Sequence, residues 1–139
     1  MGLRVPRYTI TQLTNLDVGF YETVGPFLCR RDVTDELGSP VWDDDDKTWL
    51  VATATDDDAI LGFIAVQPHG DTLGIRSLYV LPEVRRDVIG TTLVLRVLHL
   101  WPDDPVTATA TPAAKELFAD CGFEETGTRG KFTLMRLDR

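Results

Sequence analysis

Residues 78–93 read LYVLPEVRRDVIGTTL, and this segment gives the clearest indication of the fold. It begins as a strand, which ends at Leu81-Pro82 because proline cannot donate a hydrogen bond to a ladder. A basic turn follows, and from Gly90 to Trp101 apolar residues recur at the spacing of one helix face. A strand, a turn and a helix in this order predict a crossover within an α/β layered domain.

The rest of the chain also alternates strand-like and helix-like segments. Alternating or β-rich runs predict strands over Tyr8–Leu13, Thr48–Ala54, Ile60–Val66, Leu73–Val80, Val106–Ala110, Phe123–Gly127 and Phe132–Leu137. Helical spacing predicts helices over Asp17–Leu28 behind an Asn15 cap, from Asp32 to Gly38, over Gly90–Trp101, and from Thr111-Pro112 to Gly122. The crossover requires Leu73–Val80 and Val106–Ala110 to run parallel, and we expect them to splay apart at their C-terminal ends.

Composition limits the class of protein. With 139 residues, 43% of them hydrophobic, the chain is expected to form one domain over residues 1–139. It has no apolar run of membrane-spanning length and no signal-peptide core, which predicts a cytoplasmic protein without a membrane partner. A net charge of −8 argues against nucleic-acid binding. Two cysteines, Cys29 and Cys121, are too few and too far apart for a disulfide framework or a metal site.

The stretch 78–93 resembles the acetyl-CoA-binding segment of the GNAT superfamily of N-acetyltransferases, whose turn reads R/Q-x-x-G-x-G/A. Arg85 takes the first position and Gly90 the last. Such a turn suits a pyrophosphate, because free N–H groups at a helix N-terminus and the helix dipole attract anions. The resemblance implies that the phosphates of acetyl-CoA meet Arg85, Arg86, Val88, Ile89, Gly90 and Thr91, and that its pantetheine follows the backbone of Leu78 and Val80.

A second motif, TPAAKELFADCGF at residues 111–123, is similar to the family's N-x-x-A-x-x-L-Y-x-x-x-G-F helix. Ala114, Leu117, Gly122 and Phe123 fit the pattern. Two motifs in the correct order imply the GNAT-like α/β fold, which is a mixed sheet with a central splay flanked by helices. Gly62-Phe63 matches the third-strand position, so the resemblance covers most of Tyr8–Leu137.

The sequence departs from the family pattern at two positions that matter for function. Val88 replaces the middle glycine of the turn, and its β-branched side chain disfavours positive φ and crowds the phosphates. Phe118 replaces the tyrosine that protonates the departing thiolate, although its place in the motif still puts it near the cofactor. Thr111 replaces the asparagine cap.

The resemblance implies direct transfer of an acyl group from acetyl-CoA to an amine, on a small molecule or a protein. A backbone N–H near Leu78–Val80 would polarise the thioester carbonyl, and a base would take the proton of the amine. We predict Tyr79 and Glu83 as the catalytic residues. The other candidates for the base are Glu22, His69, Asp71 and Arg76.

Three further questions stay open at the level of sequence. Val88 and Phe118 also fit a degenerate family member that acts as a binding or regulatory module. A protein with this fold could transfer a group other than acetyl. The chain could also form a homodimer. The acidic run Asp43–Asp46 is expected to be a solvated loop, with a site for a metal or a cationic acceptor as the alternative.

Overall fold

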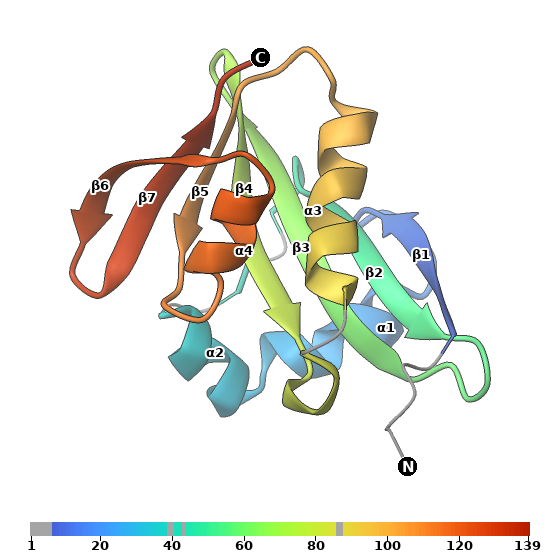
Figure 1. The fold of residues 1–139 in the computed structure, drawn as a ribbon. Helices are drawn as coiled ribbons and strands as arrows, with labels where there is room; N and C mark the ends of the chain where they lie inside the picture. Colours follow the sequence, from blue (N-terminus) through green and yellow to red (C-terminus); the bar gives the residue numbers. More distant parts are fainter. Residues whose placement is uncertain (1–6, 39–40, 43, 86–87) are drawn as a thin grey trace.

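The computed structural model describes residues 7–38, 41–42, 44–85 and 88–139. Its elements are β1 (Tyr8–Leu13), α1 (Phe20–Leu28), α2 (Arg31–Leu37), β2 (Thr48–Ala54), β3 (Ile60–His69), β4 (Thr72–Val80), the 3-10 turn η1 (Pro82–Val84), α3 (Ile89–Leu100), β5 (Val106–Ala110), α4 (Lys115–Asp120), β6 (Glu124–Arg129) and β7 (Phe132–Leu137). The strands form a seven-stranded sheet in the order β1-β2-β3-β4-β5-β7-β6. Figure 1 shows α3 and α4 in front of this sheet, and the mixed sheet with helices confirms the predicted fold class.

The sheet opens between β4 and β5. These two strands run parallel, as predicted, because the connection through α3 crosses over the sheet. Their pairing covers only three residue pairs, from Leu73 with Val106 to Ile75 with Ala108. β4 continues to Val80 and β5 to Ala110 without further pairing to each other. The C-terminal halves of the two strands therefore diverge, which confirms the predicted splay.

A β-bulge in β4 lies where this divergence begins. Ser77 pairs with Ala65 on β3, but Val66 pairs with Ile75, so Arg76 is an extra residue in β4. Before the bulge, Ile75 packs in the core under α3, whereas Arg76 is exposed. A bulge changes which face of the sheet the following residues occupy. It therefore explains why the apolar alternation of Leu73–Val80 is interrupted in the middle of the strand.

Two hydrophobic cores cover the two faces of the sheet. On one face, Leu93, Val94 and Val97 of α3 and Phe118 of α4 are buried, as the helical spacing predicted. On the other face, an aromatic cluster joins α1 and α2 to the sheet; its buried rings are Phe20, Phe27, Trp49, Phe63 and Tyr79. No helix in the described ranges is long and apolar enough to cross a membrane.

The start of α1 differs from the prediction. The helix begins at Phe20 after Gly19, whose φ is 85°, and not at Asp17 behind Asn15. Asp17 accepts a hydrogen bond from the Thr14 N–H at 2.6 Å, and the Asn15 amide donates to Asp45 at 2.7 Å. These side chains close a turn, in competition with the helix. Val18, which lies within the predicted helix but before the observed one, is fully exposed.

We expect Gly62→Ala to lower the free energy of unfolding by about 1–3 kcal/mol, the usual cost of overpacking. A Cβ on Gly62 would lie 2.7 Å from the Tyr79 carbonyl oxygen and 3.1 Å from the Val80 Cα, so the backbone of β4 would have to move. Gly127→Ala is the matched control, because its Cβ would meet only Leu134 at 3.6 Å. Equal stability of the two variants in urea unfolding would contradict the prediction.

Candidate functional site

Three contiguous cavities run through the opening between β4 and β5. The helix cavity lies against α3 and α4 and is lined by Glu36, Leu78, Val80, Arg85, Gly90, Thr111, Ala113, Ala114 and Leu117. The central cavity is lined by Leu37, Ile75, Arg76, Ser77, Leu78, Thr109, Thr111, Ala114 and Phe118. The hairpin cavity is lined by Leu37, Gly38, Ile75, Arg76, Thr109, Arg129 and Phe132. Neighbouring cavities share several of these residues, and together they form the splay cleft.

The backbone of β4 forms one wall of the cleft. The Leu81 N–H donates to the Leu61 carbonyl of β3 at 2.9 Å. Successive residues of a strand direct their N–H and C=O groups to opposite edges, so those of Val80 and Leu78 face the cleft. The Val80 carbonyl accepts a hydrogen bond from Arg85 Nε at 2.7 Å. The Val80 N–H and both polar groups of Leu78 face the cleft, where the sequence predicted contacts to pantetheine.

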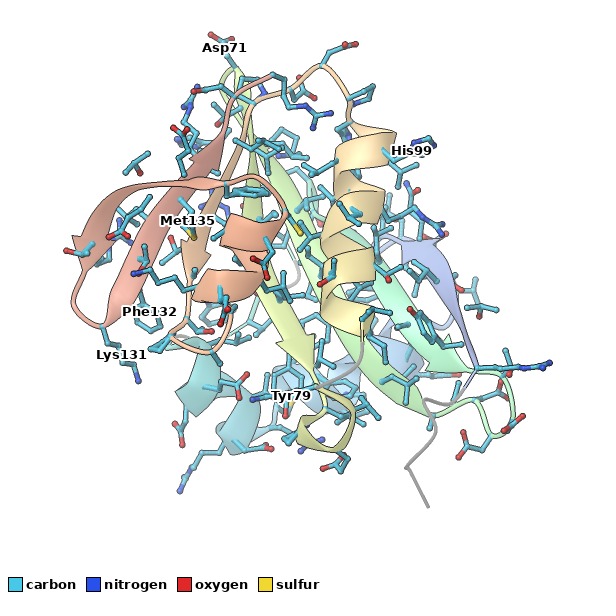
Figure 2. All side chains as sticks on the ribbon, viewed as in Figure 1. Asp71, Tyr79, His99, Lys131, Phe132 and Met135 are labelled. Atoms are coloured by element: carbon cyan, nitrogen blue, oxygen red, sulfur yellow. The ribbon has the colours of Figure 1, made fainter. Side chains whose placement is uncertain are left out.

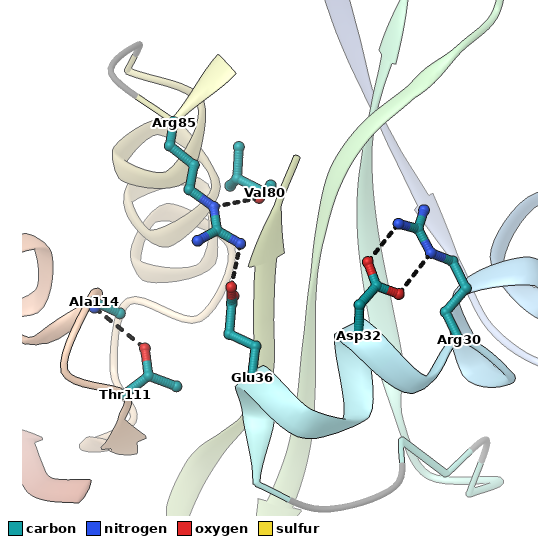
Figure 3. Close-up of polar contacts among 7 residues, drawn as sticks. All are labelled: Arg30, Asp32, Glu36, Val80, Arg85, Thr111 and Ala114. Carbon is teal, nitrogen blue, oxygen red and sulfur yellow. Dashed lines mark hydrogen bonds and ion pairs between the residues drawn. The ribbon is translucent and has the colours of Figure 1, made fainter. Parts of the chain in front are cut away.

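Arg85 links the end of β4 to α2 through a hydrogen bond and an ion pair. Its guanidinium bonds both the Val80 carbonyl and the Glu36 carboxylate, and it lies 5.3 Å from the centroid of the Tyr79 ring. Figure 3 shows Arg85 and Glu36 pointing toward each other across the end of the strand. Both side chains line the helix cavity. Glu36 therefore balances the charge of Arg85 beside the place predicted for the phosphates.

The start of α3 supplies the free amides that an anion site needs. Val88 precedes the helix with φ −81°. The backbone therefore does not adopt the positive φ that would strain a β-branched residue, and the prediction of such strain at Val88 is wrong. Its side chain is 64% exposed. Ile89 is buried and Thr91 half-buried, and of the predicted phosphate contacts only Arg85 and Gly90 line the cavity. Arg86 lies outside the described residues.

Gly90 also lies close to α4. A Cβ at this position would lie 2.8 Å from Leu117 Cδ1, so the missing side chain lets α4 approach the first turn of α3. The helix cavity lies at this junction. Gly90 thus brings the backbone of α3, the first side chains of α4 and the end of β4 to one cavity.

Phe118 and Thr111 form the opposite wall. Phe118 is 2% exposed, packs edge-on against Phe123 at 5.2 Å between ring centroids, and lines the central cavity. The Thr111 hydroxyl accepts a hydrogen bond from the Ala114 N–H at 3.2 Å (Figure 3), but the cap residue of α4 is Ala114, so the predicted capping position was wrong. The described helix itself begins only at Lys115. Phe118 offers no proton to the cavity that it lines.

Tyr79 and Glu83, predicted as the catalytic residues, do not line any of the three cavities. Tyr79 is 2% exposed in the aromatic cluster beside Phe27 and Phe63, at the η1 end of the sheet (Figure 2). Glu83 is exposed in η1. Their catalytic roles therefore stay predictions. Burial, reinforced by the carboxylates of Asp32 and Glu36, raises the pKa of Tyr79 above its ordinary value, so its hydroxyl keeps its proton at neutral pH.

The raised pKa of Tyr79 predicts a loss of stability in alkali. The unfolded chain loses this phenolic proton near pH 10.0, before the folded chain does. Above that pH the unfolded state is therefore favoured by deprotonation, and the free energy of unfolding falls as the pH rises. We expect the unfolding free energy of wild type to fall more steeply above about pH 10 than that of Tyr79→Phe. Unfolding in urea across pH 7–11 measures this difference, and parallel pH profiles would contradict it.

Several residues of the cleft were not predicted from the sequence. Ser77 and Thr109 place hydroxyl groups in the lining of the central cavity. Arg129 and Phe132 reach the hairpin cavity from the turn that joins β6 and β7. An arginine and an aromatic residue beside a hairpin turn are common on surfaces, so no local signal in the sequence assigned them to a site. The contact requires the tertiary arrangement of the hairpin and α2.

A family model described as an acetyltransferase (GNAT) domain matches residues 31–137. No curated protein matches the sequence. The structure is similar to Escherichia coli ElaA (19% identity, TM-score 0.71, covering 95% of this chain and 100% of the other) and to an acyl-CoA N-acyltransferase from Pseudomonas aeruginosa (18%, 0.72, 94% and 99%). It is also similar to the PaiA N-acetyltransferase from Thermoplasma acidophilum in complex with coenzyme A (16%, 0.64, 96% and 99%).

At these identities the structural similarities show a shared fold. The family model covers most of the chain and includes both motifs that suggested the resemblance. Together with the parallel β4–β5 pair and the splay between these strands, the family model confirms the fold and the family that the two motifs indicated. The chain belongs to the GNAT acetyltransferase family.

Proposed function

We propose that this protein transfers an acetyl group from acetyl-CoA directly to an amine, with the donor entering the splay cleft through the helix cavity. The observation that carries the proposal is that neighbouring cavities of the cleft share lining residues. The series of cavities begins between α3 and α4 beside Gly90, follows the edge of β4 that does not pair with β5, and ends at the hairpin cavity. Donor and acceptor can therefore approach one point from opposite ends.

The backbone supplies the groups that would hold the donor. The first N–H groups of α3 have no partner within the helix and would bind the pyrophosphate. The edge of β4 at Leu78 and Val80 would bind the amides of pantetheine. In this arrangement the thioester would lie near Leu78, Thr111 and Ala114, which line both the helix cavity and the central cavity.

The transfer needs few side chains. A backbone N–H of β4 would polarise the thioester carbonyl, and the neutral amine attacks its carbon as the carbon–sulfur bond breaks. The amine proton passes to a base or to water, and sulfur leaves as a thiolate because Phe118 cannot protonate it. The absence of that acid is expected to slow the reaction by about 10²–10⁴-fold, the usual contribution of general acid catalysis.

The replacement of tyrosine by Phe118 also supports a second candidate function. A family member that binds acyl-CoA as a binding or regulatory module needs the same donor site but no proton donor. Both candidates predict binding of the donor, and only the first predicts its consumption.

Thermal unfolding with acetyl-CoA and CoA, combined with mass spectrometry of an amine mixture, tests the proposal. A ligand at 100 times its dissociation constant stabilises the folded state by about 2.7 kcal/mol, which gives a measurable rise in Tm. A rise in Tm together with acetylated amine supports the enzyme. A rise without product supports the binding module. No rise at millimolar acetyl-CoA would contradict both.

A further inference from the structure

The hairpin cavity is positively charged although the chain as a whole is acidic. Of its lining residues, Arg76 and Arg129 are cationic and none is acidic. The chain contains 22 acidic and 14 basic residues, so the charge of this lining is opposite in sign to the net charge of the protein. At physiological ionic strength charges are screened beyond about 8 Å, so acidic residues far from the cavity act only weakly on a ligand inside it.

Arg76 is held at the cavity by the bulge in β4. The bulge makes Arg76 an extra residue in the strand. Its Nε donates to Gln67 Oε1 at 3.1 Å, and Gln67 in turn donates to Asp46. This contact uses one edge of the guanidinium, and Arg76 forms no ion pair with any residue of the described ranges. Its terminal N–H groups are therefore available to a ligand.

Arg129 reaches the same cavity from the end of β6. It is exposed and, among the residues that the structure describes, it has no acidic partner. The cavity is closed beside it by Phe132, whose ring lies against Gly38 at the end of α2; a Cβ on Gly38, where φ is 80°, would collide with that ring. Figure 2 shows Phe132 at the hairpin turn, next to Lys131. The two arginines thus lie in a pocket with an aromatic wall.

The position of this pocket relative to the reaction centre decides what it could bind. The hairpin cavity shares Ile75, Arg76 and Thr109 with the central cavity, where the acetyl group is proposed to lie. If the two arginines hold an anionic group of the acceptor, an amine attached to that group can point toward the central cavity. Guanidinium groups bind carboxylates with paired, charge-assisted hydrogen bonds.

We propose that the acceptor is a small amine carrying a carboxylate, such as an amino acid, and that Arg76 and Arg129 bind this carboxylate. The inference rests on the proposed acetyl transfer and names its acceptor class. The side chain of the acceptor would contact Leu37 and Phe132, the apolar part of the same lining.

The test compares amines that differ only in the carboxylate. Acetyl transfer is measured with L-leucine and 3-methylbutylamine, with L-phenylalanine and 2-phenylethylamine, and with glycyl-L-leucine, which distinguishes a free amino acid from a peptide as the source of the carboxylate. We expect kcat/KM to be at least tenfold higher for the carboxylate-bearing member of each pair. Arg76→Gln and Arg129→Gln should each reduce this preference about tenfold. Arg96→Gln, an exposed change on α3, is the matched control.

Equal or better use of the amines without a carboxylate would overturn the inference and leave acetyl transfer intact. Calorimetric titration of L-leucine and L-phenylalanine into wild type and the two variants tests the pocket when no transfer is seen. Binding that both variants weaken supports the carboxylate site, whereas no binding at about 10 mM overturns it. Failure of acetyl-CoA to raise Tm would instead reject the proposed function, independently of this titration.

Discussion

Arg85→Ala is expected to lower the free energy of unfolding by about 1.5–3 kcal/mol, the range for hydrogen bonds to charged groups. The substitution removes the bond to the Val80 carbonyl and leaves the half-buried Glu36 carboxylate without its cation. It also removes the cation beside the Tyr79 ring. For a domain of this size the loss corresponds to a fall in Tm of roughly 5–10 °C.

The matched control is Arg30→Ala. Arg30 also pairs with a carboxylate, Asp32 at 2.6 Å, but both side chains are largely exposed (Figure 3). Exposed ion pairs contribute little because water screens them, so we expect no measurable change in stability. Equal effects of the two variants would show that Arg85 does not fasten β4 to α2.

Glu36→Gln separates the two contacts of Arg85. The amide still accepts a hydrogen bond but carries no charge, so the bond to Val80 is retained while the ion pair is lost. We expect a smaller loss of stability than for Arg85→Ala. Because Arg85 then keeps an unbalanced positive charge beside the helix cavity, acetyl-CoA should bind more tightly at low salt.

The elements of the fold were largely predictable from the sequence because their signals are local. Alternation of β-formers gave the bounds of β1, β2, β5 and β7, and helical spacing gave α3 to within one residue at each end. β3 extends to His69, because Pro68 and His69 pair with Leu73 and Thr72 and only Gly70-Asp71 form the turn. The start of α1 was wrong because Asp17 and Asn15 bond outside the helix.

The cleft was predictable only in part. The motifs identified the helix cavity and the central cavity, because Gly90 and Phe118, which line them, occupy fixed places in contiguous sequence patterns. The hairpin cavity is assembled from α2, the bulge at Arg76 and the turn between β6 and β7, which lie far apart in the chain. The bulge depends on how β4 pairs with β3. The pattern of apolar residues within one strand does not show which residues of another strand it pairs with, so the bulge could not be predicted from it.

Ala114→Phe is expected to abolish donor binding with little effect on folding. Ala114 lines both the helix cavity and the central cavity, so a larger side chain can extend into empty space without displacing the core. It would fill the place where the helix cavity and the central cavity meet on the proposed path of pantetheine. We expect acetyl-CoA to bind at least 100-fold more weakly, a loss of about 2.8 kcal/mol, and acetyl transfer to fall in proportion.

Ala119→Phe is the matched control, because Ala119 lies five residues further along, within α4, and the same substitution there projects from an exposed position. It tests whether a bulky side chain on α4 disturbs the protein in general. Wild-type donor binding in Ala119→Phe and none in Ala114→Phe, with both variants folded by circular dichroism, would place the donor in the cleft. Full binding in a folded Ala114→Phe would mean that acetyl-CoA does not pass between β4 and α4, and the path proposed for the acyl group would have to be abandoned.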